Sequence, residues 1–273
     1  MADVYAAITE AEPAVVERIA EVLELRAADP RQQALRAGYL TDLTLPEGAH
    51  VLEIGCGTGP VTRSIAGLEA VTRAVGLDPS PTLLEHARRL SREHANVEFH
   101  TGDARALPFP DRDFDAVVFH TTLCHIPGPE LALAEAARVL RPGGQLVIFD
   151  ADYSTTNVAN GPADPLQAVA EACVAAIVHD PLIIHRLAAL VRRAGFTVQQ
   201  FRTHGYDGVL DPTYLLTIID RGADALLREA RIGPTLAQAL RDEARRRAEA
   251  GEFFGHITYA SLIGVRDINE DDT

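Results

Sequence analysis

The stretch His50–Gly59 constrains the fold of this chain more than any other part of the sequence. It reads HVLEIGCGTG, with apolar residues around a single acid, Glu53, and then a glycine at every second position. The residues that follow, PVTRSIA, can form a helix. A buried strand that leads through a glycine turn into a helix N-terminus is a site for a nucleotide-like ligand. Glycines suit such a turn because the backbone can approach the ligand without a Cβ in the way.

The spacing of these glycines also indicates which ligands are not expected. A dinucleotide-binding turn would have its third glycine at position 60, where this chain has Pro60. A P-loop needs Gly-Lys followed by Ser or Thr, and the turn contains no lysine. Both observations argue against a pyrophosphate or triphosphate at this turn.

A second acid supports a nucleoside site. Val71–Asp78 has the apolar pattern of a parallel strand, and its last residue, Asp78, lies 19 positions after Gly59. An acid at the carboxyl end of the second strand can accept hydrogen bonds from ribose hydroxyls. It could instead be a helix N-cap, but Ser80-Pro81 can begin the next helix without it. We therefore predict a ligand role for Asp78.

Four stretches, taken in order, resemble the class I S-adenosylmethionine-dependent methyltransferases. The resemblance covers about residues 48–152. Its motifs are Glu53-x-Gly55-x-Gly57-x-Gly59, Gly102-Asp103-Ala104, the LPFPDRDFDAVVF stretch from Leu107 to Phe119, and a helix from Glu130 to Leu140 followed by Arg141-Pro-Gly-Gly144 and the strand Gln145–Phe149.

The resemblance implies an α/β fold: a Rossmann-like, seven-stranded, mostly parallel sheet with helices on both faces and helical cap insertions. It also implies S-adenosyl-L-methionine as cofactor and S-adenosyl-L-homocysteine as product. Asp103 would meet the adenine amine and the Ala104 amide a ring nitrogen. The backbone of His120 and Thr121 would lie near the sulfonium and the amino-acid end of the cofactor. The full set of cofactor-binding residues predicted in this way is Glu53, Gly55, Cys56, Gly57, Gly59, Asp78, Pro79, Asp103, Ala104 and His120.

The acceptor is predicted to be a small molecule. The LPFPD stretch is similar to the branch that includes quinone and natural-product methyltransferases, which implies methylation of an oxygen, nitrogen or carbon atom. The Asn/Asp-Pro-Pro-aromatic tetrad of enzymes that methylate nucleic-acid bases is absent after Phe119. The net charge of −14 also argues against a nucleic-acid or anionic membrane surface, and it permits a neutral or cationic substrate.

We expect one domain over residues 1–273 with helical additions to the core. The four arginines at 241 and 245–247 lie among the acids Asp242, Glu243, Glu249 and Glu252 and are predicted to lie on a solvated helix face. The predicted parts are an N-terminal helical segment, 1–45; the core, 48–152, 182–203 and 253–266; and caps over the substrate side, 153–181 and 207–250, with helices from Pro165 to about Val178 and from Asp211 to about Ala250.

A hydroxyl or phenol acceptor would need a general base, and histidine suits neutral pH. His125 follows the fourth strand at the ligand-binding edge of the sheet, and His179 lies next to a predicted cap helix. Arg36 and Tyr39, on a predicted helix ahead of the first strand, could contact the methionine moiety or the substrate. Each of these residues could equally have a structural role.

Other functions remain open at this point. The same fold could use S-adenosylmethionine for a cyclisation, a rearrangement or regulation, without methyl transfer. A nicotinamide dehydrogenase is disfavoured by Pro60 and by the Gly102–Ala104 corner. Neither His120 with His125 nor Asp150 with Asp152 forms a recognised ligand cluster, so no metal is expected.

The sequence also supports an expectation about location. The sequence contains no run of about 18 apolar residues, so no membrane span is expected. The opening MADVY lacks the pattern of a secretory signal. The three cysteines have no disulfide or metal spacing, as is typical of a reducing compartment. We expect a cytoplasmic monomer or homodimer.

Overall fold

The computed structural model describes residue 5 and residues 8–268. Residues 1–4 and 6–7, part of the predicted N-terminal helical segment and of the opening considered for a secretory signal, lie outside that range. Within the described residues, the strands form a seven-stranded sheet in the order β3-β2-β1-β4-β5-β7-β6. The strands are parallel except β7, which runs antiparallel to β5 and β6. The predicted fold class is confirmed. The strands are β1 (Ala49–Ile54), β2 (Val71–Asp78), β3 (Val97–Thr101), β4 (Phe114–His120), β5 (Leu140–Asn157), β6 (Phe196–Asp207) and β7 (His256–Arg266).

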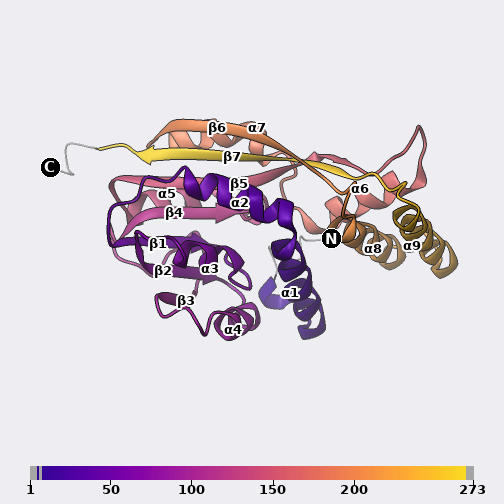
Figure 1. Ribbon diagram of the computed structural model, residues 1–273, viewed down its shortest axis with the longest axis horizontal. Coiled ribbons are helices and arrows are strands. Elements are labelled where there is room, and N and C mark those ends of the chain that lie inside the picture. The colour runs from indigo at the N-terminus through magenta and orange to yellow at the C-terminus, as the bar shows by residue number, and fades with distance from the viewer. Residues whose placement is uncertain (1–4, 6–7, 269–273) are drawn as a thin grey trace.

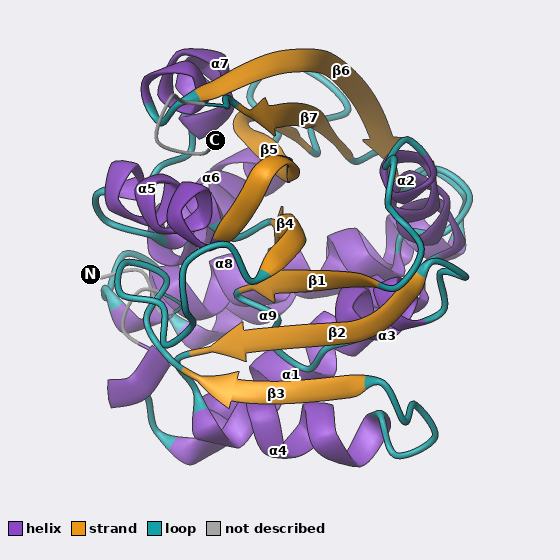
Figure 2. Cartoon of the chain, turned by 90° about the vertical axis from the view of Figure 1, so that its left-hand side faces the viewer, coloured by secondary structure: helices purple, strands orange, loops and turns teal. Residues whose placement is uncertain are grey.

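Helices cover both faces of this sheet. In Figure 2, α5 and α7 lie on the left of the sheet and α2 and α3 on the right. Because the central strands are buried on both faces, they are continuous apolar runs, such as Val117–Phe119 in β4, and do not alternate with polar residues. The core helices are α1 (Pro13–Ala28), α2 (Pro30–Thr41), α3 (Pro60–Ala66), α4 (Pro81–Leu90), α5 (Pro129–Val139) and α7 (Ile183–Arg193), with short 3-10 turns η1 (Ile8–Glu10) and η2 (Leu123–His125).

Two helix starts follow the predicted caps. The Asp29 carboxylate accepts hydrogen bonds from the backbone N–H of Arg31 at 2.7 Å and of Gln32 at 3.1 Å. The Ser80 hydroxyl accepts one from the N–H of Leu83 at 3.3 Å. A side-chain oxygen at this position satisfies a donor that the helix itself cannot. Since Ser80 caps α4, Asp78 is free for another role.

Strands β5 and β6 are longer than predicted. β5 was expected to end at Phe149, yet it continues to Asn157, and β6, expected over Phe196–Phe201, continues to Asp207. The extension pairs with β7, with Asp152 opposite Thr258 and Tyr206 opposite Ile257. Residues 153–157 are therefore part of the sheet. The predicted tight turn at 141–144 lies within the bounds of β5, where the register with β4 shifts. Polar residues extend a strand here because a distant partner satisfies their backbone, which local sequence does not reveal.

A group of three helices lies beyond the extended strands (Figure 1). These are α6 (Pro165–Ile177), α8 (Thr213–Arg228) and α9 (Pro234–Glu249), which we call the cap helices. The expected single helical stretch to Ala250 is two helices, because Gly233-Pro234 starts a new one. Helix α8 comes very close to α6 at Gly222, where a Cβ would lie 1.9 Å from the carbonyl oxygen of Val169. Only glycine permits this approach.

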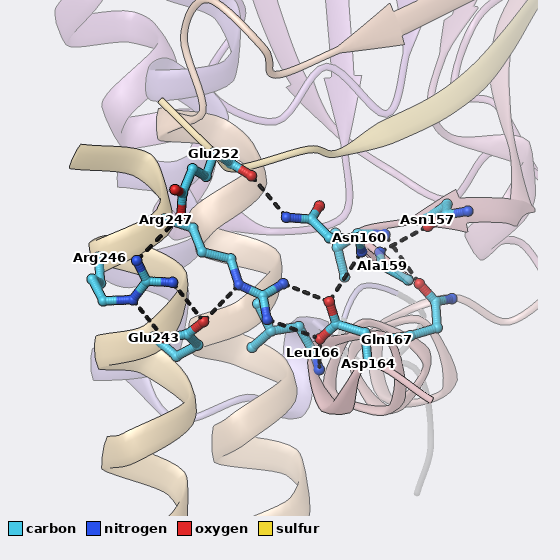
Figure 3. A network of polar contacts seen from close by, with 11 residues as sticks. Asn157, Ala159, Asn160, Asp164, Leu166, Gln167, Glu243, Arg246, Arg247 and Glu252 are labelled. Atoms are coloured by element: carbon cyan, nitrogen blue, oxygen red, sulfur yellow. Dashed lines mark hydrogen bonds and ion pairs between the residues drawn. The ribbon is translucent and has the colours of Figure 1, made fainter. Parts of the chain in front are cut away.

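Ion pairs join α9 to its neighbours. Figure 3 shows Arg247 of α9 directed at Asp164, the N-cap of α6, at 2.5 Å, with Glu243 at 2.7 Å from the same guanidinium. The side chains of Arg247 and Asp164 are only 13% and 5% exposed. Arg245 and Arg246 are 46% and 56% exposed and pair with acids. The prediction of a solvated face is thus wrong for Arg247, which holds α9 against the start of α6.

None of the helices in residue 5 and residues 8–268 combines the length and apolar character needed to cross a membrane.

Candidate active site

The carboxyl ends of β1, β2 and β4 open into a cavity of about 370 Å³, which we call the cofactor cavity. This volume lies within the range of about 300–1,000 Å³ that is typical of small-molecule and cofactor sites. All predicted cofactor residues except Gly59 line it, and so does His125. The ring of Phe99 lies 2.8 Å from where a Cβ of Gly59 would be, so Gly59 lets the loop pack on β3.

The glycine loop and Asp78 are bonded to each other. Gly57 donates its N–H to Asp78 Oδ2 at 2.9 Å, and Ser80 donates its N–H to Asp78 Oδ1 at 2.9 Å. Gly57 has a φ of +55°, in the left-handed region that favours glycine. These contacts fix the carboxylate at the wall of the cavity.

Burial changes the acidity of two carboxyls in this wall. It raises the pKa of Asp78 to about 6, although the N–H groups of Ser80 and Gly57 oppose the shift. Burial raises the pKa of Glu53 to about 8, against the hydrogen bond from the Thr62 hydroxyl. Asp78 is therefore mostly ionised at neutral pH, whereas Glu53 is mostly protonated.

Asp103 occupies a different environment at the same cavity. Its side chain is 49% exposed and forms an ion pair with Arg105 at 2.7 Å. The hydrogen bond from Arg105 is the largest effect, and it lowers the pKa of Asp103. Asp103 stays ionised. A ligand that binds its carboxylate would do so beside the Arg105 guanidinium.

The exit of β4 has an unusual backbone. Thr121, a β-branched residue, has a φ of +51°, a conformation that costs such residues about 1–3 kcal/mol. Its N–H donates to the Phe149 carbonyl at 2.6 Å, and its hydroxyl accepts from Arg26 Nη2 at 2.8 Å. Strain of this kind is often found at functional sites. Sequence reasoning placed the backbone of Thr121 near the cofactor but did not predict this conformation.

The three candidate histidine positions differ. His120 lines the cofactor cavity, its Nδ1 lies 2.9 Å from the Tyr39 hydroxyl, and its ring stacks on Phe149. Burial, with the charges of Arg26 and Arg36, holds the pKa of His120 well below its usual value, so the ring stays neutral. His125 lines the cavity with its ring 4.5 Å from that of Tyr5. His179 is exposed and is not brought to the site.

Two further candidates lie behind the site. Tyr39 is buried and contacts His120 and Phe149, and neither it nor Arg36 lines the cavity. In this position Tyr39 orients the His120 ring. No group of three or more His, Cys, Asp or Glu side chains that could hold a metal ion occurs within the described ranges.

A smaller cavity of about 40 Å³ adjoins the first and is walled in part by the cap helices α6 and α8; we call it the inner chamber. The two cavities meet, since they share Tyr5, Leu23, Arg26, Thr121 and His125. The inner chamber is further lined by Val22, Tyr153, Thr156, Cys173, Val174, Ile177, Tyr214, Ile218 and Arg221.

Sequence reasoning missed the two arginines of this chamber, although a signal was present. In α1, Arg26 continues the buried series Val16, Ile19 and Ala20 at helical spacing. In α8, Arg221 follows the buried Tyr214 and Ile218 at the same spacing. An arginine on the apolar stripe of a helix is a candidate for a functional site, because a buried charge needs a partner.

Helix α1 is attached to the glycine loop. Glu24 accepts hydrogen bonds from the Thr58 hydroxyl at 2.6 Å and from Arg63 at 2.9 Å. Leu23, one residue earlier, lies 2.8 Å from where a Cβ of Gly57 would be. The helix therefore forms a wall over the loop and also supplies Arg26 to both cavities.

Comparison with known proteins adds independent findings. A family model described as a methyltransferase domain matches residues 52–148. An uncharacterized 37.1 kDa protein in transposon TN4556 of Streptomyces fradiae is 31% identical over 188 residues, covering 68% of this chain and 54% of that protein. Demethylmenaquinone methyltransferase of Bacillus licheniformis is 37% identical over 109 residues, covering 40% and 47%. The chain spans about half the length of these curated relatives.

The fold is shared with solved structures. The crystal structure of the (4+2)-cyclase SpnF matches with a TM-score of 0.55 and 23% identity, covering 87% of this chain and 82% of that one. At this identity the likeness concerns the fold alone. The domain match covers the glycine loop, Asp78 and Asp103, which also border the cofactor cavity. On these grounds residues 52–148 form a domain of the class I S-adenosylmethionine-dependent methyltransferases.

Proposed function

We propose that this protein transfers a methyl group from S-adenosylmethionine to an oxygen, nitrogen or carbon atom of a small-molecule acceptor. The observation that carries the proposal is the cofactor cavity of about 370 Å³, which is bordered by the glycine loop and continues into a second cavity under the cap helices. One cavity would hold the cofactor and the other part of the acceptor.

The residues present fit this cofactor. The buried, mostly ionised carboxylate of Asp78 would accept hydrogen bonds from the ribose hydroxyls, beside backbone that lacks a Cβ at Gly57. Asp103 and Ala104 would hold the adenine, and the backbone from His120 to Thr122 would border the methionine end. When bound, the cofactor supplies an electrophilic methyl on a positively charged sulfur.

The chain must then orient the acceptor and remove its proton where necessary. His125 lines both cavities, so it would face an acceptor at their junction. We assign it as the general base for a hydroxyl or phenol acceptor. His120 would contribute backbone only, because its Nδ1 is engaged by Tyr39 and its ring is packed on Phe149.

Two measurements test the proposal. Calorimetry should detect binding of S-adenosylmethionine and S-adenosylhomocysteine, and no affinity for either would refute it. Methyl-labelled S-adenosylmethionine, incubated with phenols, hydroquinones and amines, should transfer label to an acceptor.

The alternative is a non-methylating reaction on the same fold, such as a cyclisation. It remains worth testing because the fold is also that of a cyclase. Conversion of a substrate in the presence of the cofactor, without label in the product, would favour this alternative over methyl transfer.

A further inference from the structure

The inner chamber has a cationic lining. Arg26 and Arg221 contribute to it, and among the described residues around it there is no aspartate or glutamate. Arg26 donates to the Thr121 hydroxyl at 2.8 Å. Arg221 donates to the carbonyl and hydroxyl of Thr217, at 3.2 and 3.3 Å. Neither arginine forms an ion pair within residue 5 and residues 8–268.

This arrangement leaves donors available. A guanidinium carries five N–H groups, so each arginine has more donors than these hydrogen bonds use. Two half-buried cations without a carboxylate destabilise the fold unless a ligand compensates them. The exposed arginines of α9, in contrast, all pair with acids.

The guanidinium groups of both arginines border the same cavity. Burial raises the pKa of the Tyr5 phenol, and the charges of Arg221 and then Arg26 oppose that shift. Tyr5 itself lines the chamber. The two arginines therefore face a common volume, although they come from helices distant in the sequence.

A buried hydroxyl provides a second observation. Thr156 lines the chamber, is only 6% exposed, and its hydroxyl has no hydrogen-bond partner among the described residues. An unsatisfied buried hydroxyl costs about 1–3 kcal/mol and indicates a missing partner. A ligand oxygen in the chamber would supply one.

The size of the chamber narrows the chemistry. A water-sized group needs about 10–15 Å³ by this measure of volume. The chamber, of about 40 Å³, therefore accommodates roughly three non-hydrogen atoms. A carboxylate group is small enough for that space.

We propose that the inner chamber binds a carboxylate of the methyl acceptor, held by Arg26 and Arg221 with the Thr156 hydroxyl as an additional donor. The proposal rests on the proposed function, since it makes the carboxylate part of the acceptor. No residue of the glycine loop lines the chamber, so this carboxylate anchors the acceptor while another of its atoms faces the methyl group. An anionic acceptor is the opposite of what the net charge of −14 suggested.

The test uses the whole protein saturated with S-adenosylhomocysteine and titrated calorimetrically with hexanoate, with hexanamide and with inorganic phosphate. Hexanoate should bind at least tenfold more tightly than hexanamide, and phosphate should not compete. Arg221→Met should remove the preference for hexanoate and leave the affinity for S-adenosylhomocysteine within twofold, because Arg221 does not line the cofactor cavity. Arg228→Met, at an exposed position of the same helix, should retain the preference.

Equal binding of hexanoate and hexanamide by the unmodified protein would overturn the proposal. A preference that survives in Arg221→Met, or stronger binding of phosphate than of hexanoate, would also overturn it. The titrations are repeated without S-adenosylhomocysteine. Carboxylate binding by a protein with no affinity for that compound would refute the methyltransferase function and retain the carboxylate site.

Discussion

The cofactor cavity and the inner chamber differ in charge and in origin. The first lies in the part of the sheet matched by the methyltransferase family model, and its walls carry both charges, with Asp78 and Asp103 beside Arg26 and Arg105. The second lies under the cap helices and has Arg26 and Arg221 with no described acid. An acceptor with a carboxylate suits the arginines of the inner chamber. The difference teaches that a net charge of −14 does not predict the charge of a ligand, because the relevant charges are local.

The largest effect is expected from Gly57→Val, which should weaken cofactor binding alone. A β-branched residue at a φ of +55° is strained, and its Cβ would lie 2.8 Å from Leu23. We expect at least a hundredfold loss of affinity for S-adenosylhomocysteine by calorimetry, with hexanoate binding retained. Gly161→Val, where a Cβ would meet nothing within 4 Å, is the matched control. Unchanged cofactor affinity in Gly57→Val would mean that the site is elsewhere.

The next effect concerns the border between the two cavities. With a hydroxyl acceptor, His125→Gln should lower kcat by about 10²–10⁴-fold, the usual contribution of a general base. The affinity for S-adenosylhomocysteine should change little. A change in KM with kcat preserved would instead identify His125 as a residue that positions the acceptor.

A smaller effect is a dependence of affinity on pH, which should be found at the cofactor cavity and not at the inner chamber. Since the pKa of Asp78 is about 6, its carboxylate is mostly ionised at pH 7 and mostly protonated at pH 5. Affinity for S-adenosylhomocysteine should therefore fall about tenfold as the pH drops across that range. Asp78→Asn should bind more weakly and show no such dependence. The arginines of the inner chamber keep their charge throughout. A flat profile for the unmodified protein would contradict the role of Asp78.

The smallest effect should be confined to the cap helices. Arg247→Met removes the partner of the nearly buried Asp164, which still accepts the N–H groups of Asn160 and Leu166. We expect a destabilisation of about 1–2 kcal/mol, seen as a drop in Tm of about 2–8 °C, with unchanged affinity for S-adenosylhomocysteine. Arg246→Met, at an exposed ion pair, should leave the Tm unchanged. Equal losses in the two variants would show that burial of the pair does not matter.

The same comparison explains what the sequence could predict. The glycine loop and Asp78 lie on short, regular connections whose geometry follows from local residue types, so their meeting at one sheet edge was predictable. The inner chamber combines α1, the end of β5, α6 and α8, which are brought together by packing between distant segments. Gly222 shows this dependence, because its significance appears only when α6 lies against it.

The predicted lengths of β5 and β6 were wrong for a related reason. Residues 152–157 are mostly polar and would not be read as a strand alone, but Asp152 and Asn157 pair with residues of β7 about a hundred positions away. Arg26 and Arg221 each stand on an apolar stripe, and that local irregularity was the available signal. His179 was chosen for its place beside a predicted helix, which says nothing about the direction of its side chain.

Helix α1 touches the glycine loop through Glu24 and contributes Arg26 to the chamber beneath the cap helices. One rigid element thus forms a wall for two different molecules. By thermodynamic reciprocity, any effect that one ligand has through this helix on the affinity for the other is returned by the same factor.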